Sequence, residues 1–214
     1  MTFDAFCPVG GSRDAYDACL DFARRPNAAT RLLVVDGPVG CGKTHLLHAI
    51  ANDVRASRQN AEVLCLAATA LVDRLVSAIV SDSSPTLVDR LSYFHVILID
   101  DLFTLSGREF ATRAVGRALG RWVRAGVLVA AASSGGAAQL ARLTEEVPEA
   151  SRRHVIIRRP TERQIVRILK RRAAAVAVRG GTLRRIARRS RGDVGRAFGM
   201  LTTAGVRRMN GRAA

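Results

Sequence analysis

The sequence predicts an α/β fold: a parallel five-stranded sheet with helices on both faces, followed by a small all-helical lid. Wholly apolar stretches of strand length alternate with helical patterns over residues 31–158, which is typical of a parallel sheet that is buried on both faces. A glycine-rich turn joins the first strand to a helix. From residue 159 onward only helical periodicity remains. A chain of 214 residues is long enough for one such core and a small appended subdomain.

The elements are expected in the following order. Residues 1–30 form an irregular N-terminal segment with a short helix near 14–23. Apolar runs predict strands at 31–36, 62–66, 96–99, 127–132 and 155–157. Helices are expected at 43–57, 69–80, 85–92 and 108–124. The core therefore spans 31–158 and the lid 159–214.

Three apolar stripes at helical spacing predict three helices in the lid. The stripes consist of Ile165, Ile168 and Leu169, then Leu183 and Ile186, then Val194, Phe198 and Leu201.

Charge is distributed very unevenly along the chain. Residues 1–150 hold 15 Lys/Arg and 16 Asp/Glu, whereas residues 151–214 hold 19 Lys/Arg and only two acids, a net charge of +17. The first two lid helices carry basic stripes, made up of Arg163, Arg167, Lys170, Arg171, Arg184, Arg185, Arg188 and Arg189. This asymmetry favours an anionic partner, and we expect sequence-independent DNA binding through phosphates. An anionic membrane surface and a merely solvated basic face are the alternatives.

Several protein classes are not favoured by the sequence. No apolar run reaches the length of a membrane span, and the first residues lack the order of a signal peptide. The four cysteines form no C-x-x-C pair, and His45 and His48 lack a third metal ligand. We therefore expect a soluble cytoplasmic protein with free thiols.

A complete phosphate-binding motif, G-x-x-x-x-G-K-[ST], follows the first predicted strand and opens a helix. It consists of Gly37, Pro38, Val39, Gly40, Cys41, Gly42, Lys43 and Thr44, and His45 follows it. The loop N–H groups and the helix N-terminus can hold phosphates, Lys43 can reach the outer phosphates, and the Thr44 hydroxyl can ligate Mg²⁺. The chain has only two lysines among its 34 basic residues, yet one stands here, where a compact ammonium is needed. The motif predicts binding of ATP with Mg²⁺.

Acidic and basic residues elsewhere complete the predicted site. Asp100 ends the third strand, where a carboxylate can hold Mg²⁺, and Asp101 can orient or deprotonate the attacking water. Ser134 could sense the outer phosphate at the end of the fourth strand. Arg152 or Arg153 could project into the ATP of a neighbouring subunit as an arginine finger, although either could equally be a solvated side chain.

Three stretches carry a family resemblance. Residues 3–6 (Phe-Asp-Ala-Phe), 37–50 (the phosphate loop, then His-Leu-Leu-His-Ala-Ile) and 97–101 (Ile-Leu-Ile-Asp-Asp) together resemble the AAA+ module of the bacterial replication initiator family, DnaA, with its short regulatory relative Hda. The helices at 69–92 lie where that clade carries an insertion. Because the sequence ends after the lid, the family's C-terminal helix-turn-helix domain is expected to be absent.

The resemblance implies roles for individual residues. Lys43, Thr44 and Asp100 would bind Mg-ATP, Asp101 would serve hydrolysis, and Arg152 would act in trans. Arg108 matches a basic position that helps the initiator bind single-stranded DNA. The family's nucleotide-sensing lid arginine falls at Gly195, and Arg196 follows one residue later, about 100° around a helix.

These features leave three hypotheses. The first is a DnaA/Hda-like ATP switch in replication initiation or its regulation, with slow, assembly-dependent hydrolysis and a self-assembled or DnaA-type partner. The second is a helicase-loader or transposition-helper ATPase. The third is an interaction protein that binds ATP without hydrolysing it, and the altered lid position keeps this hypothesis open.

Overall fold

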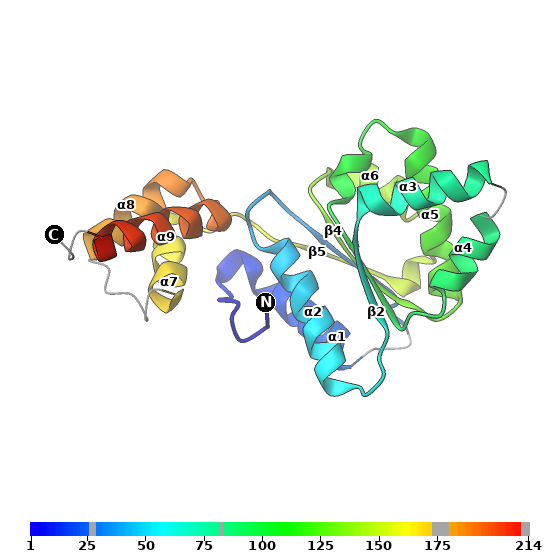
Figure 1. The fold of residues 1–214 in the computed structure, drawn as a ribbon, viewed down its shortest axis with the longest axis horizontal. Helices are drawn as coiled ribbons and strands as arrows, with labels where there is room; N and C mark the ends of the chain where they lie inside the picture. The colour runs from blue at the N-terminus through cyan, green and yellow to red at the C-terminus, as the bar shows by residue number, and fades with distance from the viewer. Residues whose placement is uncertain (26–28, 82–83, 173–179, 211–214) are drawn as a thin grey trace.

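A computed structural model of the chain describes residues 1–25, 29–81, 84–172 and 180–210 (Figure 1). Five strands form one parallel sheet in the order β2-β3-β4-β1-β5. Their bounds are β1 Leu32–Asp36, β2 Val63–Ala67, β3 Val96–Asp100, β4 Leu128–Ser133 and β5 Arg152–Ile156. The predicted parallel α/β architecture is confirmed. Because β1 lies between β4 and β5, the turn that follows β1 opens near the carboxyl ends of its neighbours.

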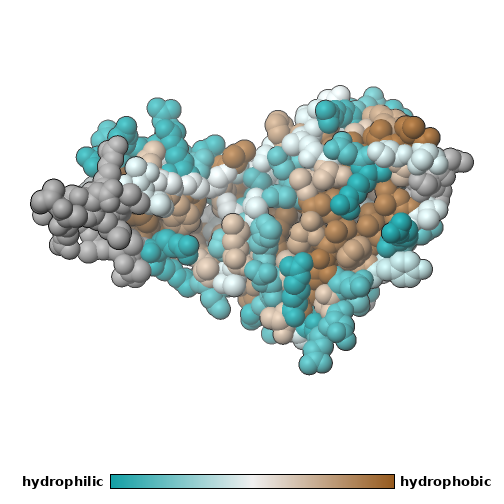
Figure 2. All heavy atoms as spheres, in the orientation of Figure 1, coloured by the Kyte–Doolittle hydropathy of each residue, from teal (hydrophilic) through white to brown (hydrophobic). Residues whose placement is uncertain are grey.

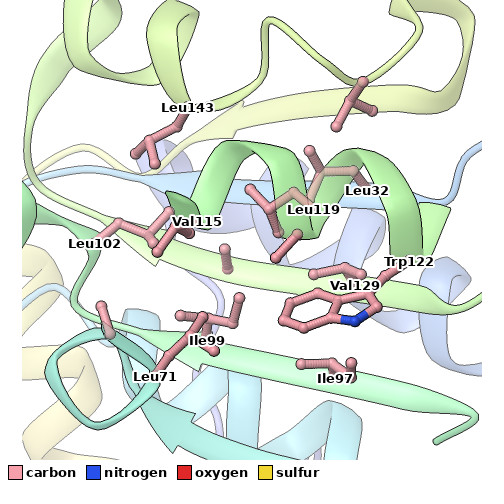
Figure 3. Close-up of a cluster of buried hydrophobic side chains, with 14 of the residues drawn as sticks. Leu32, Leu71, Ile97, Ile99, Leu102, Val115, Leu119, Trp122, Val129 and Leu143 are labelled. Atoms are coloured by element: carbon pink, nitrogen blue, oxygen red, sulfur yellow. The ribbon is translucent and has the colours of Figure 1, made fainter. Parts of the chain in front are cut away.

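One face of the sheet is covered by α3 (Ala68–Val80), α4 (Ser84–Leu91), α5 (Glu109–Arg124) and α6 (Gly136–Leu143). In Figure 3, Trp122 and Leu119 of α5 lie over Ile97 and Val129 of the sheet, and Leu71 approaches from α3. The Trp122 indole is fully buried and donates a hydrogen bond to the Val88 carbonyl (3.0 Å).

The opposite face is covered by α1 (Arg13–Arg24) and α2 (Lys43–Ser57), which pack on the alternate residues of the same strands. Leu32 and Val34 of β1 point to the α3/α5 side, whereas Leu33 and Val35 point to the α1/α2 side. This explains why the strand is apolar throughout rather than alternating.

The lid consists of α7 (Glu162–Arg172), α8 (Gly180–Ser190) and α9 (Val194–Asn210). Its own apolar cluster contains the residues of the three predicted stripes except Ile168, among them Ile165, Leu183 and Leu201. The N-terminal segment runs between the lid and α2 (Figure 1). It is tied to the lid, because the Arg171 guanidinium donates to the Asp4 carbonyl (2.6 Å). It is also tied to the segment after β5, where the Arg158 N–H donates to the Gly11 carbonyl (2.9 Å).

The structure differs from the predicted elements in two places. The last strand begins at Arg152, three residues earlier than predicted, because it pairs along the whole of β1. Helix α6, rich in glycine and alanine, was not predicted.

The predicted lid also includes residues 173–179 and 211–214, which lie outside the described residues. Within the described parts of the chain, no helix is both long and apolar enough to cross a membrane.

Candidate functional site

The turn between β1 and α2 has the backbone conformation of a phosphate cradle. Gly40 (φ 80°) and Gly42 (φ 99°) adopt left-handed conformations that side chains rarely tolerate. A Cβ at Gly42 would lie 2.9 Å from the Phe6 ring. The Gly37 N–H donates to the Ser133 carbonyl of β4 (3.1 Å), so the turn is anchored to the sheet. The glycine spacing in the sequence therefore matches a backbone requirement.

Lys43, the first residue of α2, is folded back over this turn. Its side chain is buried, and its ammonium donates to the carbonyls of Gly37 (2.7 Å) and Pro38 (2.9 Å). Burial lowers the pKa of Lys43, and nearby Cys41 and the carboxylates of Asp36, Asp100 and Asp101 act in the opposite direction. A buried cation with only neutral carbonyl partners is suited to exchange them for anionic phosphate oxygens.

Two carboxylates lie across from this lysine at the end of β3. One oxygen of Asp100 accepts a hydrogen bond from the Asp101 N–H (2.9 Å). Asp101 has a left-handed backbone (φ 60°) and is exposed. A left-handed non-glycine residue carries a modest conformational cost and is common at functional sites. The result is that the two adjacent carboxylates differ in environment, one half-buried and the other open to solvent.

Asp36 is a further acid that the sequence reasoning did not single out. It ends β1 directly before the glycine-rich turn, and one of its carboxylate oxygens is buried without a hydrogen-bond partner among the described residues. The other oxygen lies 3.8 Å from His154 Nε2 of β5. Its position immediately before the turn was the available signal, but a strand-terminal acid is common enough that the position alone did not identify it.

A cleft of about 750 Å³ joins the glycine-rich turn, Lys43, Asp100 and Asp101, and Asp36 is not among its lining residues. Its polar end is lined by Gly40, Gly42, Lys43, Thr44, Asp100, Asp101 and Ser134. Its apolar end is lined by side chains of four separate segments, namely Phe6, Cys7, Val9, Ile157, Ile168, Val194 and Phe198. The volume lies in the range of small-molecule sites, and one apolar end with one polar end suits a planar base joined to a charged group. The apolar end was not predicted from the sequence.

A family model described as the bacterial DnaA ATPase domain matches residues 1–152 of this chain. The chain belongs to the bacterial DnaA ATPase-domain family. Three solved structures resemble this DnaA-type chain over most of its length. Domain III of the DnaA replication initiation protein of Thermotoga maritima is 21% identical, with a TM-score of 0.79 over 92% of this chain and 84% of that chain.

AMPPCP-bound DnaA of Aquifex aeolicus is 18% identical, with a TM-score of 0.75 over 99% of this chain and 69% of that chain. A replication initiator DnaA bound to AMPPCP and single-stranded DNA is also 18% identical, with a TM-score of 0.78 over 99% of this chain and 68% of that chain. At such identities the structural likeness shows that this DnaA-type chain has the AAA+ P-loop fold.

The lid arginine expected to sense nucleotide does not line the cleft in this DnaA-type chain. Gly195 and Val194 line it, whereas Arg196 is exposed and is not among the lining residues. Arg196 follows Gly195 by one residue, so its side chain leaves α9 in a different direction from the position that lines the cleft. Two other lid cations, Arg171 and Arg172, do line the cleft.

The remaining predicted residues lie at separate places. Arg152 is at the amino end of β5, beside Leu32, and its guanidinium donates to the Thr144 carbonyl (3.0 Å) and hydroxyl (2.9 Å). It lies at the opposite end of the sheet from the glycine-rich turn, so it is not part of this chain's own cleft. Arg108 is exposed at the start of α5.

His45 of α2 also lines the cleft. Its Nε2 is 2.9 Å from the Thr2 carbonyl and its ring packs edge-on against Phe6. Burial lowers the pKa of His45, and the hydrogen bond to Thr2 acts in the opposite direction. These contacts are structural, since they attach the N-terminal segment to α2.

Proposed function

We propose that this chain binds Mg-ATP in the cleft between the glycine-rich turn and the lid, and uses it to control assembly and DNA contact in replication initiation or its regulation. The observation that carries the proposal is the meeting of the phosphate cradle, Lys43 and the paired acids at the polar end of one cleft. Membership of the DnaA ATPase-domain family supports it, as does AMPPCP binding by the two solved relatives.

ATP fits the two ends of the cleft. Backbone N–H groups of the turn and the amino end of α2 would hold the phosphates, with Lys43 moving from its carbonyl partners to the outer phosphates. Val9, Ile157 and Phe198 would enclose the base at the apolar end.

A magnesium ion also fits the donor set. The Thr44 hydroxyl and the Asp100 carboxylate are hard oxygen ligands that face the same cleft. We assign them to Mg²⁺, which would neutralise charge on the phosphates. The exposed Asp101 is assigned to orienting and deprotonating the attacking water.

Hydrolysis is proposed to be slow and to depend on assembly. Within this chain's cleft the lid supplies Gly195 where the family has a sensing arginine. Arg152 would serve the site of a neighbouring subunit, and it must first leave its hydrogen bonds with Thr144. If Arg152 acts on the site of a neighbouring subunit, dilute monomer lacks this component of the catalytic site.

The lid is the proposed DNA-contact surface. All eight arginines and lysines of the two basic stripes are exposed, and Figure 2 shows hydrophilic side chains projecting from this part of the molecule. Apart from the bond between Arg171 and the Asp4 carbonyl, the described residues offer these cations no ion-pair partner. Unpaired cations at this density attract phosphate through counterion release. Arg108 could add a contact on the core.

Two experiments test the proposal. Calorimetry with Mg-ATP tests the cleft. Titration of labelled DNA and of anionic vesicles across salt tests the lid, using charge reversal to glutamate at Arg163, Arg167, Arg184 and Arg188. Four matched reversals at the exposed core residues Arg74, Arg90, Arg117 and Arg142 serve as the control. Loss of four phosphate contacts lowers the salt slope for duplex DNA by about 3 to 4. An unchanged slope would exclude the lid as the contact surface, and binding to vesicles alone would identify a membrane instead.

A further inference from the structure

The amino end of α9 uses the glycine-rich turn as a hydrogen-bond acceptor. The first N–H groups of a helix have no partner within the helix. In α9 the Arg196 N–H donates to the Asp193 carboxylate (2.8 Å), so Asp193 caps the helix. The Val194 N–H instead donates to the Gly40 carbonyl (2.8 Å), within the turn that would hold the phosphates.

The Asp193 side chain packs directly on the same glycine. A Cβ built on Gly40 would lie 2.2 Å from both the carboxyl carbon and one carboxylate oxygen of Asp193. Gly40 is therefore required for two reasons, its left-handed backbone (φ 80°) and the approach of the lid. Burial raises the pKa of the neighbouring Cys41, Lys43 and Arg159 act in the opposite direction, and the Asp193 carboxylate adds a smaller upward contribution.

The chain approaches this contact through a strained turn. Arg191 (φ 51°) and Gly192 (φ 80°) are both left-handed, and the Arg191 carbonyl accepts a hydrogen bond from Arg159 (3.1 Å). A non-glycine residue in this conformation persists only where its surroundings fix it. The turn, the cap and the contact with Gly40 therefore form one ordered structural unit. We call it the α9 clasp, and it consists of Asp193 and Val194 in contact with Gly40.

We propose that the α9 clasp couples the nucleotide site to the lid in this chain, in the place of the absent lid arginine. The inference rests on the proposed nucleotide site. Gly40 belongs to the turn whose N–H groups would hold phosphate, and its carbonyl holds the lid. Filling the cleft reorients this peptide segment, and the lid, with its basic stripes, responds. Asp193 is a positioning residue that acts through the backbone of Gly40.

Three variants separate the clasp from ordinary helix capping. Asp193→Ala removes the cap and the side-chain contact with Gly40, and it leaves the Val194 N–H as the remaining bond to the Gly40 carbonyl. Asp193→Asn keeps a capping oxygen of the same shape without the charge. Thr161→Ala removes the equivalent cap of α7, where the Thr161 hydroxyl accepts from the Gln164 N–H (3.3 Å), in the same lid but away from Gly40. Backbone amide exchange, followed residue by residue with and without Mg-ATP, is the readout, and calorimetry measures ATP binding to the same samples.

In the nucleotide-free wild type, the Val194 amide is expected to be protected. Asp193→Ala is expected to lower this protection about fivefold to tenfold, because loss of the cap hydrogen bond to the Arg196 N–H loosens the first turn of α9. Thr161→Ala should leave the protection unchanged, and Asp193→Asn should keep most of it. Mg-ATP is expected to change lid exchange in the wild type and in Thr161→Ala. In Asp193→Ala, ATP still binds but the lid exchange no longer responds.

Two results would overturn the coupling: an unprotected Val194 amide in the wild type, or a lid response to Mg-ATP that survives in Asp193→Ala. The wild-type measurement needs no variant, so poor folding of Asp193→Ala does not prevent the test. If calorimetry detects no ATP binding while Val194 is protected, the proposed nucleotide function fails and the clasp remains as a lid contact.

Discussion

Lys43→Ala is the sharpest test of the nucleotide site, because its effect on binding and its effect on stability should differ. In the free protein the ammonium already donates to two neutral carbonyls, at 2.7 and 2.9 Å. Binding would exchange these for bonds to charged oxygens, each stronger by about 1.5 kcal/mol. Two such exchanges amount to about 3 kcal/mol, a loss of affinity of about 150-fold in the variant.

The stability of the variant should change little. Removing the side chain forfeits two hydrogen bonds but also removes the cost of burying an ammonium, so we expect a change within about 1 kcal/mol. Calorimetry with Mg-ATP and urea unfolding measure the two quantities. Lys170→Ala, at the only other lysine and exposed in the lid, is the control. ATP affinity of Lys43→Ala within about threefold of wild type would refute the assignment of the phosphate site.

Three further predictions address catalysis, the core and pH. Asp101→Asn should lower turnover about 100-fold, as measured by phosphate release at several protein concentrations, and should leave ATP affinity within about threefold. Fast turnover in dilute monomer would contradict the proposed mechanism. Trp122→Phe removes the bond to Val88 and leaves a gap in the core, so urea unfolding should show a loss of about 2 kcal/mol, and an unchanged midpoint would show that the indole is not needed. The folded-state pKa of His45 is lowered, so the folded state binds fewer protons than the unfolded state, and stability should fall as pH drops below about 6.5. His45→Gln should show a shallower fall between about pH 7 and 5, and an identical pH dependence would exclude His45 as the cause.

The parts of the site that were predicted are those whose residues are adjacent in the sequence. The glycine-rich turn could be recognised from the sequence alone, because its left-handed positions, Gly40 and Gly42, are glycines that stand next to Lys43. The apolar end of the cleft was not predicted, because Val9, Ile157 and Phe198 come from three segments that only the fold brings together.

The fold followed from the same kind of local signal, with similar limits. Continuous apolar strands predicted the parallel sheet, but the strand order depends on crossovers that no local pattern specifies. Arg152 and Arg153 have little strand character of their own, and they become the start of β5 because β1 offers an unpaired edge. Helix α6 lacks both a capping side chain and a long apolar stripe, so its existence depends on packing beside α5.

The charges around Lys43 bear on the proposal that hydrolysis depends on a second subunit. Around Lys43 three carboxylates, those of Asp36, Asp100 and Asp101, act on one buried ammonium. Phosphates entering there add negative charge, and the bound metal would offset only part of it. Transition-state charge must be met by groups already in position, because reorganising them is costly. The lid cannot supply such a group at Gly195, and Arg152 is held at the far end of the sheet. Arg171 and Arg172 are lid cations that do line the cleft, and Arg171 is held by the Asp4 carbonyl. The proposed cation from a neighbouring subunit would add to these two, so we expect ATP to stay bound in the monomer and turnover to rise with assembly.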